Sequence, residues 1–252
     1  MPTVPPILDF DPDRSALIEP GRRRKDLPER CVLTFFWKAA KRKAEEEGGE
    51  ELAPLRSEMP DIPVYRIEKG GTPLAIAPAG VGAPLAGAQL EDLVARGARK
   101  IIVCGGAGVL DSDIACGEVV VPVSALRDEG TSYHYMPPGE DALPCPKALA
   151  AILAVLEERE IPYRSGRTWT TDAIYRETPG KIKRRKEQGC ITVEMEAAAL
   201  FAIAAFRGAS LGQILYGGDD VGGDEWDSRD WTRNRNARED LLGLALEACL
   251  RL

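Results

Sequence analysis

Apolar residues along this chain gather in short runs, and amphipathic stretches with a helical period lie between the runs. Runs in which nearly every side chain is apolar are typical of strands that are buried on both faces of a sheet. The predicted strands cover residues 31–36, 64–67, 74–77, 100–104, 117–123, 163–171, 190–193 and 210–216. The predicted helices cover residues 38–47, 83–96, 146–159, 194–207 and 235–252.

The order of these elements indicates an α/β protein. A strand at 74–77, a helix at 83–96 and a strand at 100–104 follow one another, which predicts a parallel strand–helix–strand unit. Gly70 and Gly71 predict a tight turn before the first of these strands. We therefore expect a three-layer α/β/α sandwich with a mixed central sheet. The strand-rich middle of the chain predicts that this sheet curls toward a distorted barrel.

Composition is that of one globular domain. The chain has 252 residues, of which 44% are hydrophobic and 29% are charged, which is enough to build a sizeable core. Residues 1–30 are rich in Pro, Arg and Asp, and we expect them to form an irregular lead-in. The run of three arginines and a lysine at 22–25 is most simply a solvated charged turn. Residues 31–252 are expected to form a single domain.

Charge and cysteine usage exclude several classes of function. A formal net charge of −7 disfavours nucleic acid or an anionic membrane surface as the main partner. No apolar run reaches the length of a membrane span, and the first residues lack the layout of a signal peptide. Six scattered cysteines without a CxxC pair indicate reduced thiols in a cytoplasmic protein. With His134 as the only histidine and no clustered ligands, we expect no metal site.

Two glycine-rich segments follow neighbouring apolar strands. Residues 79–84 open the predicted helix at 83–96, and residues 105–108 follow the strand at 100–104. Glycines let backbone N–H groups approach an anion, and a helix N-terminus adds a favourable partial charge. The carboxyl ends of parallel strands are where ligands bind in open α/β sheets. We therefore expect Gly82, Gly105 and Gly106 to lie in loops that face an anion.

Two carboxylates flank a methionine where a strand meets an alanine-rich helix. Glu194, Met195 and Glu196 come directly after the predicted strand at 190–193. An acidic group at this place can hold sugar hydroxyls while the apolar helix keeps the site rigid. The alternative is an ordinary helix start, since carboxylates favour helix N-termini.

These segments, in this order and spacing, resemble the nucleoside phosphorylase superfamily, which includes purine and uridine phosphorylases and methylthioadenosine nucleosidases. The resemblance runs from about residue 71 to residue 252 and includes segments 117–122 and 171–175. It implies a catalytic domain that cleaves the N-glycosidic bond of a purine-type nucleoside and releases the base and ribose 1-phosphate. It also implies phosphate as co-substrate, no further cofactor, and a homo-oligomer, either a dimer or a hexamer.

The resemblance also implies roles for individual residues. Asp220 and Glu196 are the expected catalytic residues, because a carboxylic acid that shares a proton near neutral pH can assist departure of the base. The expected ribose contacts are Glu194, Met195, Glu196 and His134. The expected base contacts are Ile174, Tyr175 and Asp220. The expected phosphate contacts are Gly82, Gly105, Gly106 and Lys38.

The usual phosphate clamp of the family is missing. Val103 stands where the family has an Arg, Gly106 replaces a Ser or Thr, and the first strand is not followed by a Gly-Asp-Pro-x-Arg loop. Bidentate Arg contacts to a dianion are hard to replace. The candidate substitutes are Lys38, Arg42, Arg66, Arg127 or a group from a neighbouring subunit. Hydrolysis without phosphate and a non-catalytic nucleoside-binding protein therefore remain alternatives.

Overall fold

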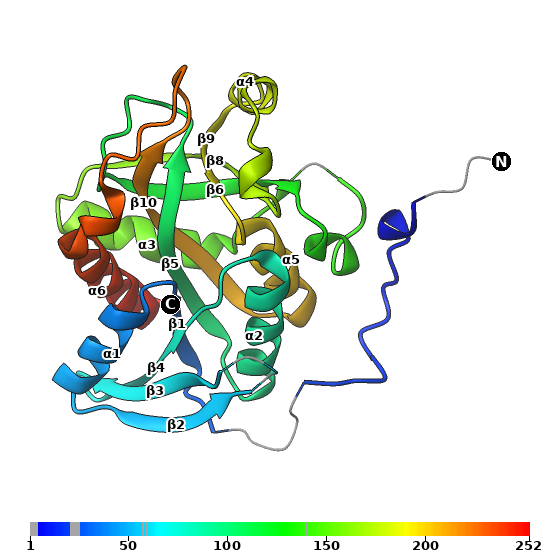
Figure 1. Ribbon diagram of the computed structural model, residues 1–252. Coiled ribbons are helices and arrows are strands. Elements are labelled where there is room, and N and C mark those ends of the chain that lie inside the picture. The colour runs from blue at the N-terminus through cyan, green and yellow to red at the C-terminus, as the bar shows by residue number, and fades with distance from the viewer. Residues whose placement is uncertain (1–4, 21–25, 57, 59, 140) are drawn as a thin grey trace.

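The computed structural model describes residues 5–20, 26–56, 58, 60–139 and 141–252 (Figure 1). The charged turn predicted at residues 22–25 lies outside the described residues. The described part of the lead-in forms the short 3-10 helix η1 (Pro6–Leu8) and otherwise has no regular structure. This segment runs along one side of the molecule.

Ten strands form one mixed sheet in the described part of the chain. They are β1 (Arg30–Thr34), β2 (Glu50–Leu55), β3 (Ile62–Lys69), β4 (Thr72–Pro78), β5 (Lys100–Val109), β6 (Val119–Asp128), β7 (Asp141–Ala142), β8 (Tyr163–Thr171), β9 (Cys190–Glu194) and β10 (Ser210–Asp220). Strands β4 and β5 both pair with β1 in parallel, which confirms the predicted strand–helix–strand unit. Strands β3 and β4 form the predicted antiparallel hairpin.

Part of this sheet closes on itself. The strand order β10–β6–β8–β9–β5 is completed by pairing of β10 with β5, so these five strands form a ring. The ring is uneven, because β10 with β6 and β5 with β9 share only two residue pairs each. Strands β1, β4, β3 and β2 extend outward from β5. The predicted distorted barrel is thus confirmed.

Helices cover both faces of the sheet (Figure 1). They are α1 (Trp37–Glu46), α2 (Ala83–Ala95), α3 (Pro146–Glu158), α4 (Pro179–Glu187), α5 (Ala197–Arg207) and α6 (Arg235–Arg251). Helices α2 and α5 pack on one face around Leu90 and Phe201, and α1, α3 and α6 pack on the other around Ile152 and Leu242. The three-layer prediction is confirmed. No described helix is long and apolar enough to span a membrane.

Several elements differ from the prediction because tertiary pairing overrides local signals. Strand β5 continues through residues 105–108, which were predicted to form a loop, because they pair with β10 and β9. Strand β10 likewise extends to Asp220 instead of ending at Tyr216. Helix α4 was missed because it buries none of its residues and shows no apolar stripe. Strands β2 and β7 were missed as well, and each lies outside the five-strand ring.

Candidate active site

One cavity of about 740 Å³ lies where several parallel strands end. Its walls come from the segment after β1, from β5 and β10, from the junction of β9 with α5, and from the start of α6. The polar and charged side chains that line it are Lys38, Arg42, Glu177, Glu194, Glu196, Gln213, Asp219, Thr232, Arg235 and Arg238. Far-separated segments therefore meet at the sheet edge where ligands bind in α/β folds.

Glu194 is held by the protein itself. One carboxylate oxygen accepts the Thr170 hydroxyl at 2.6 Å, and the other accepts the backbone N–H groups of Glu196 at 2.7 Å and Ala197 at 2.6 Å. Ala197 is the first residue of α5, so Glu194 satisfies donors that a helix start leaves unpaired. Its own oxygens are thereby engaged, and it fixes the backbone of Glu196.

Glu196 and Met195 line the cavity at the mouth of α5. The Gly82 N–H donates to one Glu196 oxygen at 2.6 Å, and the backbone N–H of Met195 also interacts with the carboxylate. Burial, together with the neighbouring Glu194 charge, raises the pKa of Glu196 above its ordinary value. The side chain is 6% exposed, so it is rigid and largely desolvated.

The structure brings Asp219, not Asp220, to the cavity. Both residues lie on β10, whose pairing with β5 shifts register between Gly217 and Asp220. Asp219 lines the cavity, with Oδ1 close to Gly108. Asp220 is 8% exposed and binds Arg229 at 2.6 Å, the Gly222 N–H at 2.8 Å and the Ser112 hydroxyl at 3.2 Å. Asp220, the residue predicted from the sequence, therefore lies outside the cavity lining, on a strand that continues where a loop was predicted.

Glu177 lies in the cavity wall on the segment between 3-10 helix η3 (Ile174–Arg176) and α4. Burial and the negative charge of Asp219 raise the pKa of Glu177 to about 7, although Lys181 opposes the shift. Glu177 is therefore the carboxyl group in this wall that holds a proton near neutral pH. The sequence prediction missed Glu177, although it directly follows the segment assigned to the base.

Cations line the same cavity. Arg238 of α6 donates its Nε–H to the Tyr216 hydroxyl at 3.2 Å and its terminal N–H groups to two backbone carbonyls. Lys38 and Arg235 also line the cavity, are exposed, and have no ion-pair partner among the described residues. Arg42, a candidate substitute in the prediction, lines the cavity but is paired with Glu239.

The glycines predicted to bind phosphate each have a contact within the chain. The Gly82 N–H is used by Glu196, as described above. Gly105 and Gly106 lie in β5 and line the cavity as strand backbone. A Cβ at Gly106 would lie 3.0 Å from the Tyr216 ring, and a Cβ at Gly105 would lie 2.9 Å from Phe35. Glycine at these two positions therefore leaves room for Phe35 and Tyr216. The Tyr216 ring occupies the space next to Gly106, where the family has a Ser or Thr.

Other predicted contacts divide between the cavity and the surface. Ile174 lines the cavity, but Tyr175 is 95% exposed and lies outside the lining. His134, at the end of 3-10 helix η2 (Thr131–His134), is also exposed and outside the lining. Arg127 is engaged by Ser132 and two backbone carbonyls, so it does not serve as a phosphate ligand in this chain.

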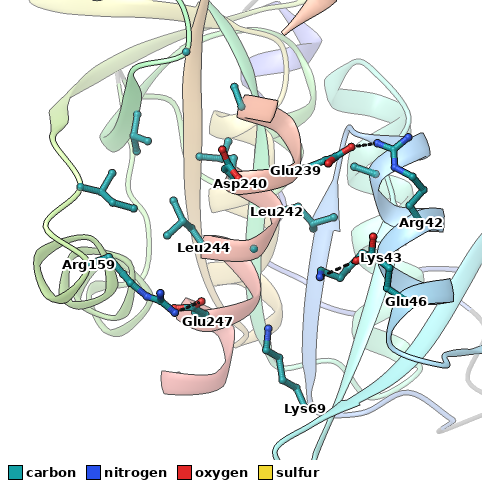
Figure 2. Close-up of a pocket in the computed structure, with 17 residues that line it drawn as sticks. Arg42, Lys43, Glu46, Lys69, Arg159, Glu239, Asp240, Leu242, Leu244 and Glu247 are labelled. Carbon is teal, nitrogen blue, oxygen red and sulfur yellow. Dashed lines mark hydrogen bonds and ion pairs between the residues drawn. The ribbon is translucent and has the colours of Figure 1, made fainter. Parts of the chain in front are cut away.

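A second hollow of about 650 Å³ flanks α6 and is lined by charged side chains (Figure 2). Arg42 with Glu239 and Arg159 with Glu247 form ion pairs across it, and Lys43 pairs with Glu46. Figure 2 shows these charges turned toward one another. Because its charges neutralise each other, this hollow attracts a charged ligand much less than the first cavity does.

Comparison with known proteins shows the family. The family model described as the phosphorylase superfamily matches residues 31–251. The chain belongs to the phosphorylase superfamily.

Individual relatives carry related descriptions. A guanosine phosphorylase of Halorubrum lacusprofundi is 32% identical over 144 residues, which cover 57% of this chain and 60% of that protein. A DeoD-type purine nucleoside phosphorylase of Dichelobacter nodosus is 28% identical over 82% of this chain and 85% of that protein. The solved purine nucleoside phosphorylase of Toxoplasma gondii, in complex with immucillin-H, has a TM-score of 0.79 at 22% identity. It matches 95% of this chain and 98% of that chain, and this likeness concerns the fold.

No group of three potential metal ligands occurs in the described ranges. The six cysteines are all free thiols, and Cys31, Cys104, Cys190 and Cys249 are buried. The charged groups that line the cavity are carboxyl groups and cations.

Proposed function

We propose that the protein is a nucleoside phosphorylase that cleaves the N-glycosidic bond of a purine nucleoside and releases the base and ribose 1-phosphate. The observation that carries the proposal is that carboxyl groups and cations line one cavity. The carboxyl groups come from β9–α5, the segment after η3 and β10, and the cations come from α1 and α6. In the proposal the carboxyl groups meet the nucleoside and the cations meet phosphate, and we call these two sets the carboxyl end and the cationic end. These groups suit the two substrates. A nucleoside is rich in N–H and O–H donors, which carboxyl groups accept, and inorganic phosphate is an anion, which cations attract.

At the carboxyl end, Glu196 is placed to accept sugar hydroxyls while Met195 packs against the ring. Ile174 and Val221 line the cavity beside Glu177 and Asp219, and they offer apolar contact to the faces of a base. Because one relative is described as a guanosine phosphorylase, we expect guanosine and inosine to be better substrates than adenosine.

At the cationic end, Arg238 is the main phosphate ligand in this proposal. Tyr216 and the carbonyls of Trp231 and Thr232 orient its guanidinium, which has five N–H donors and retains some for an anion. Lys38 adds a charge from α1, as predicted from the sequence. Arg235, one helical turn before Arg238, adds a second charge from α6.

The reaction follows from these positions. A phosphate oxygen forms the new bond to the anomeric carbon as the bond to the base nitrogen breaks. The electron pair of the broken bond goes to the base, whose N7 takes a proton from Asp219 while Asp219 takes one from Glu177. Positive charge develops on the sugar in between, and Glu196 stabilises it through the hydroxyls. No cofactor is required beyond phosphate as co-substrate.

We also infer a homo-oligomer. Trp37, Val81 and Ile174 line the cavity yet are 43%, 69% and 53% exposed, which gives the opening an apolar rim. Such exposed apolar surface marks interaction sites. A second copy that covers this rim would also exclude water from the cavity, and light scattering measures the state directly.

The test is release of free base from guanosine, inosine, adenosine and uridine, each with and without phosphate. Release that depends on phosphate, with guanosine preferred, supports the proposal. Equal release without phosphate would instead establish a nucleosidase, a hydrolytic enzyme on the same fold. Ligand-induced thermal stabilisation without any turnover would leave a nucleoside-binding protein.

A further inference from the structure

Trp226 makes a polar contact although its side chain is not packed in the core. Its side chain is 66% exposed, so it contributes little to the core. Its indole N–H nevertheless donates to Oδ2 of Asp219 at 2.7 Å, which is a short and well-formed hydrogen bond. Trp226 itself does not line the cavity, whereas Asp219 does. Trp226 therefore contacts the Asp219 carboxylate from outside the cavity.

The segment that carries Trp226 is tied to the sheet at both ends. Asp220 and Asp227 exchange two backbone hydrogen bonds of 2.8 and 3.0 Å, which close the intervening residues into a short loop. The Asp220 carboxylate binds the Gly222 N–H inside this loop and Arg229 just after it. Arg229 in turn donates to the Ile114 carbonyl at 2.6 Å. Asp220 is therefore the anchor of the loop.

We propose that Trp226 is a positioning residue for Asp219, carried on a loop that Asp220 and Arg229 anchor. The inference rests on the proposed function, in which Asp219 passes a proton to the base. The indole fixes Oδ2, and this leaves Oδ1, which lies near Gly108 in the cavity floor, to meet the ligand. Without that donor, the carboxylate is free to rotate, and its repulsion from Glu177 favours turning away from the cavity.

The test compares two substrates that differ in their need for a proton. Guanosine needs a proton at N7 as the base departs, whereas 7-methylguanosine already carries a fixed positive charge there. Trp226→Phe is expected to lower kcat/KM for guanosine about 10- to 50-fold, within the range ascribed to general acid–base groups. The same variant should stay within about 3-fold of the wild type on 7-methylguanosine, because a substrate of this kind does not need the acid.

A double-mutant cycle separates positioning from simple packing. In an Asp219→Asn background, Trp226→Phe should cause no further loss on guanosine, because both changes remove the same interaction. Trp226→His, which keeps a ring N–H, should retain more guanosine activity than Trp226→Phe.

Three results would overturn the inference: full guanosine activity in Trp226→Phe, an equal loss on both substrates, or additive losses in the cycle. Each of these requires an active wild-type enzyme. A wild type that releases no guanine with phosphate present would instead refute the proposed function, so the two failures are distinguishable.

Discussion

The two ends of the cavity are built in different ways. At the carboxyl end, Glu194 and Glu196 are each 6% exposed and are held by backbone N–H groups of neighbouring residues. At the cationic end, Lys38 and Arg235 are exposed, and only Arg238 is oriented by several hydrogen bonds. The difference reflects what each end must recognise. Hydroxyl and N–H groups require short, directional contacts from desolvated acceptors, whereas a phosphate is attracted over several ångströms by charge alone.

The largest expected effect is at the carboxyl end. Asp219→Asn should reduce guanosine cleavage about 100- to 1,000-fold, because the amide cannot supply the proton that the base takes up. Steady-state release of guanine with saturating phosphate measures this loss. Cleavage of 7-methylguanosine is the control, and a comparable loss on that substrate would show that Asp219 has another role.

The second effect concerns the sugar. Glu196→Gln should lower kcat/KM for guanosine roughly 10- to 100-fold, since hydrogen bonds to a charged group contribute about 1.5–3 kcal/mol. The same substitution should have a smaller effect on a substrate without the sugar hydroxyl that Glu196 accepts. Comparison of guanosine with its 2′-deoxy and 3′-deoxy analogues identifies that hydroxyl. An identical loss on all three substrates would contradict the assignment.

Changes at the cationic end should act on phosphate. Arg238→Gln is expected to raise KM for phosphate roughly 10- to 30-fold, because it removes an oriented, charge-assisted donor. Lys38→Gln should raise it only about 2- to 5-fold, as expected for an exposed charge. Added salt should diminish the Lys38 effect more than the Arg238 effect. If Lys38→Gln is the more damaging change, Arg238 is not the main ligand.

The smallest effect is on the stability of the ligand-free protein. Because the pKa of Glu196 is raised in the folded state, the folded chain holds a proton that the unfolded chain releases at about pH 4.3. Stability therefore falls as pH rises through the interval between these two pKa values. Glu196→Gln removes this penalty, so its Tm should match that of the wild type near about pH 4 and exceed it by roughly 2–4 °C near about pH 8. If Tm changes with pH in the same way in both proteins, then ionisation of Glu196 does not destabilise the folded chain.

The comparison also explains what could be predicted. The carboxyl end is encoded locally, because Glu194, Met195 and Glu196 are adjacent in the chain and follow an apolar strand. Tertiary structure adds the partners that hold them, such as Thr170 and the Gly82 N–H. The cationic end draws on Lys38 near one end of the chain and on Arg235 and Arg238 near the other. One helical turn separates the two arginines, but no local signal shows that this turn faces α1.

The assignment of Asp219 and Asp220 shows the limit most directly. The sequence contains the pair of carboxylates and the preceding strand, and from these the general place of the acid follows. Which of the two enters the cavity depends on how far β10 continues, and that depends on pairing with β5 and on the backbone bridge between Asp220 and Asp227. A one-residue difference on a strand reverses the face, so the local sequence does not decide which of the two carboxylates faces the cavity.

The sequence by itself determined the layered α/β architecture and the acidic helix mouth, because runs of apolar residues and adjacent functional groups are local properties. Only the tertiary structure decided the roles of the glycines at 105 and 106, whose missing side chains leave room for Phe35 and Tyr216. It alone decided that Trp226 reaches Asp219 and that cations of α1 and α6 share one cavity. These features depend on contacts between distant segments, and such contacts exist only after the sheet has formed its pairing and the helices have packed on it.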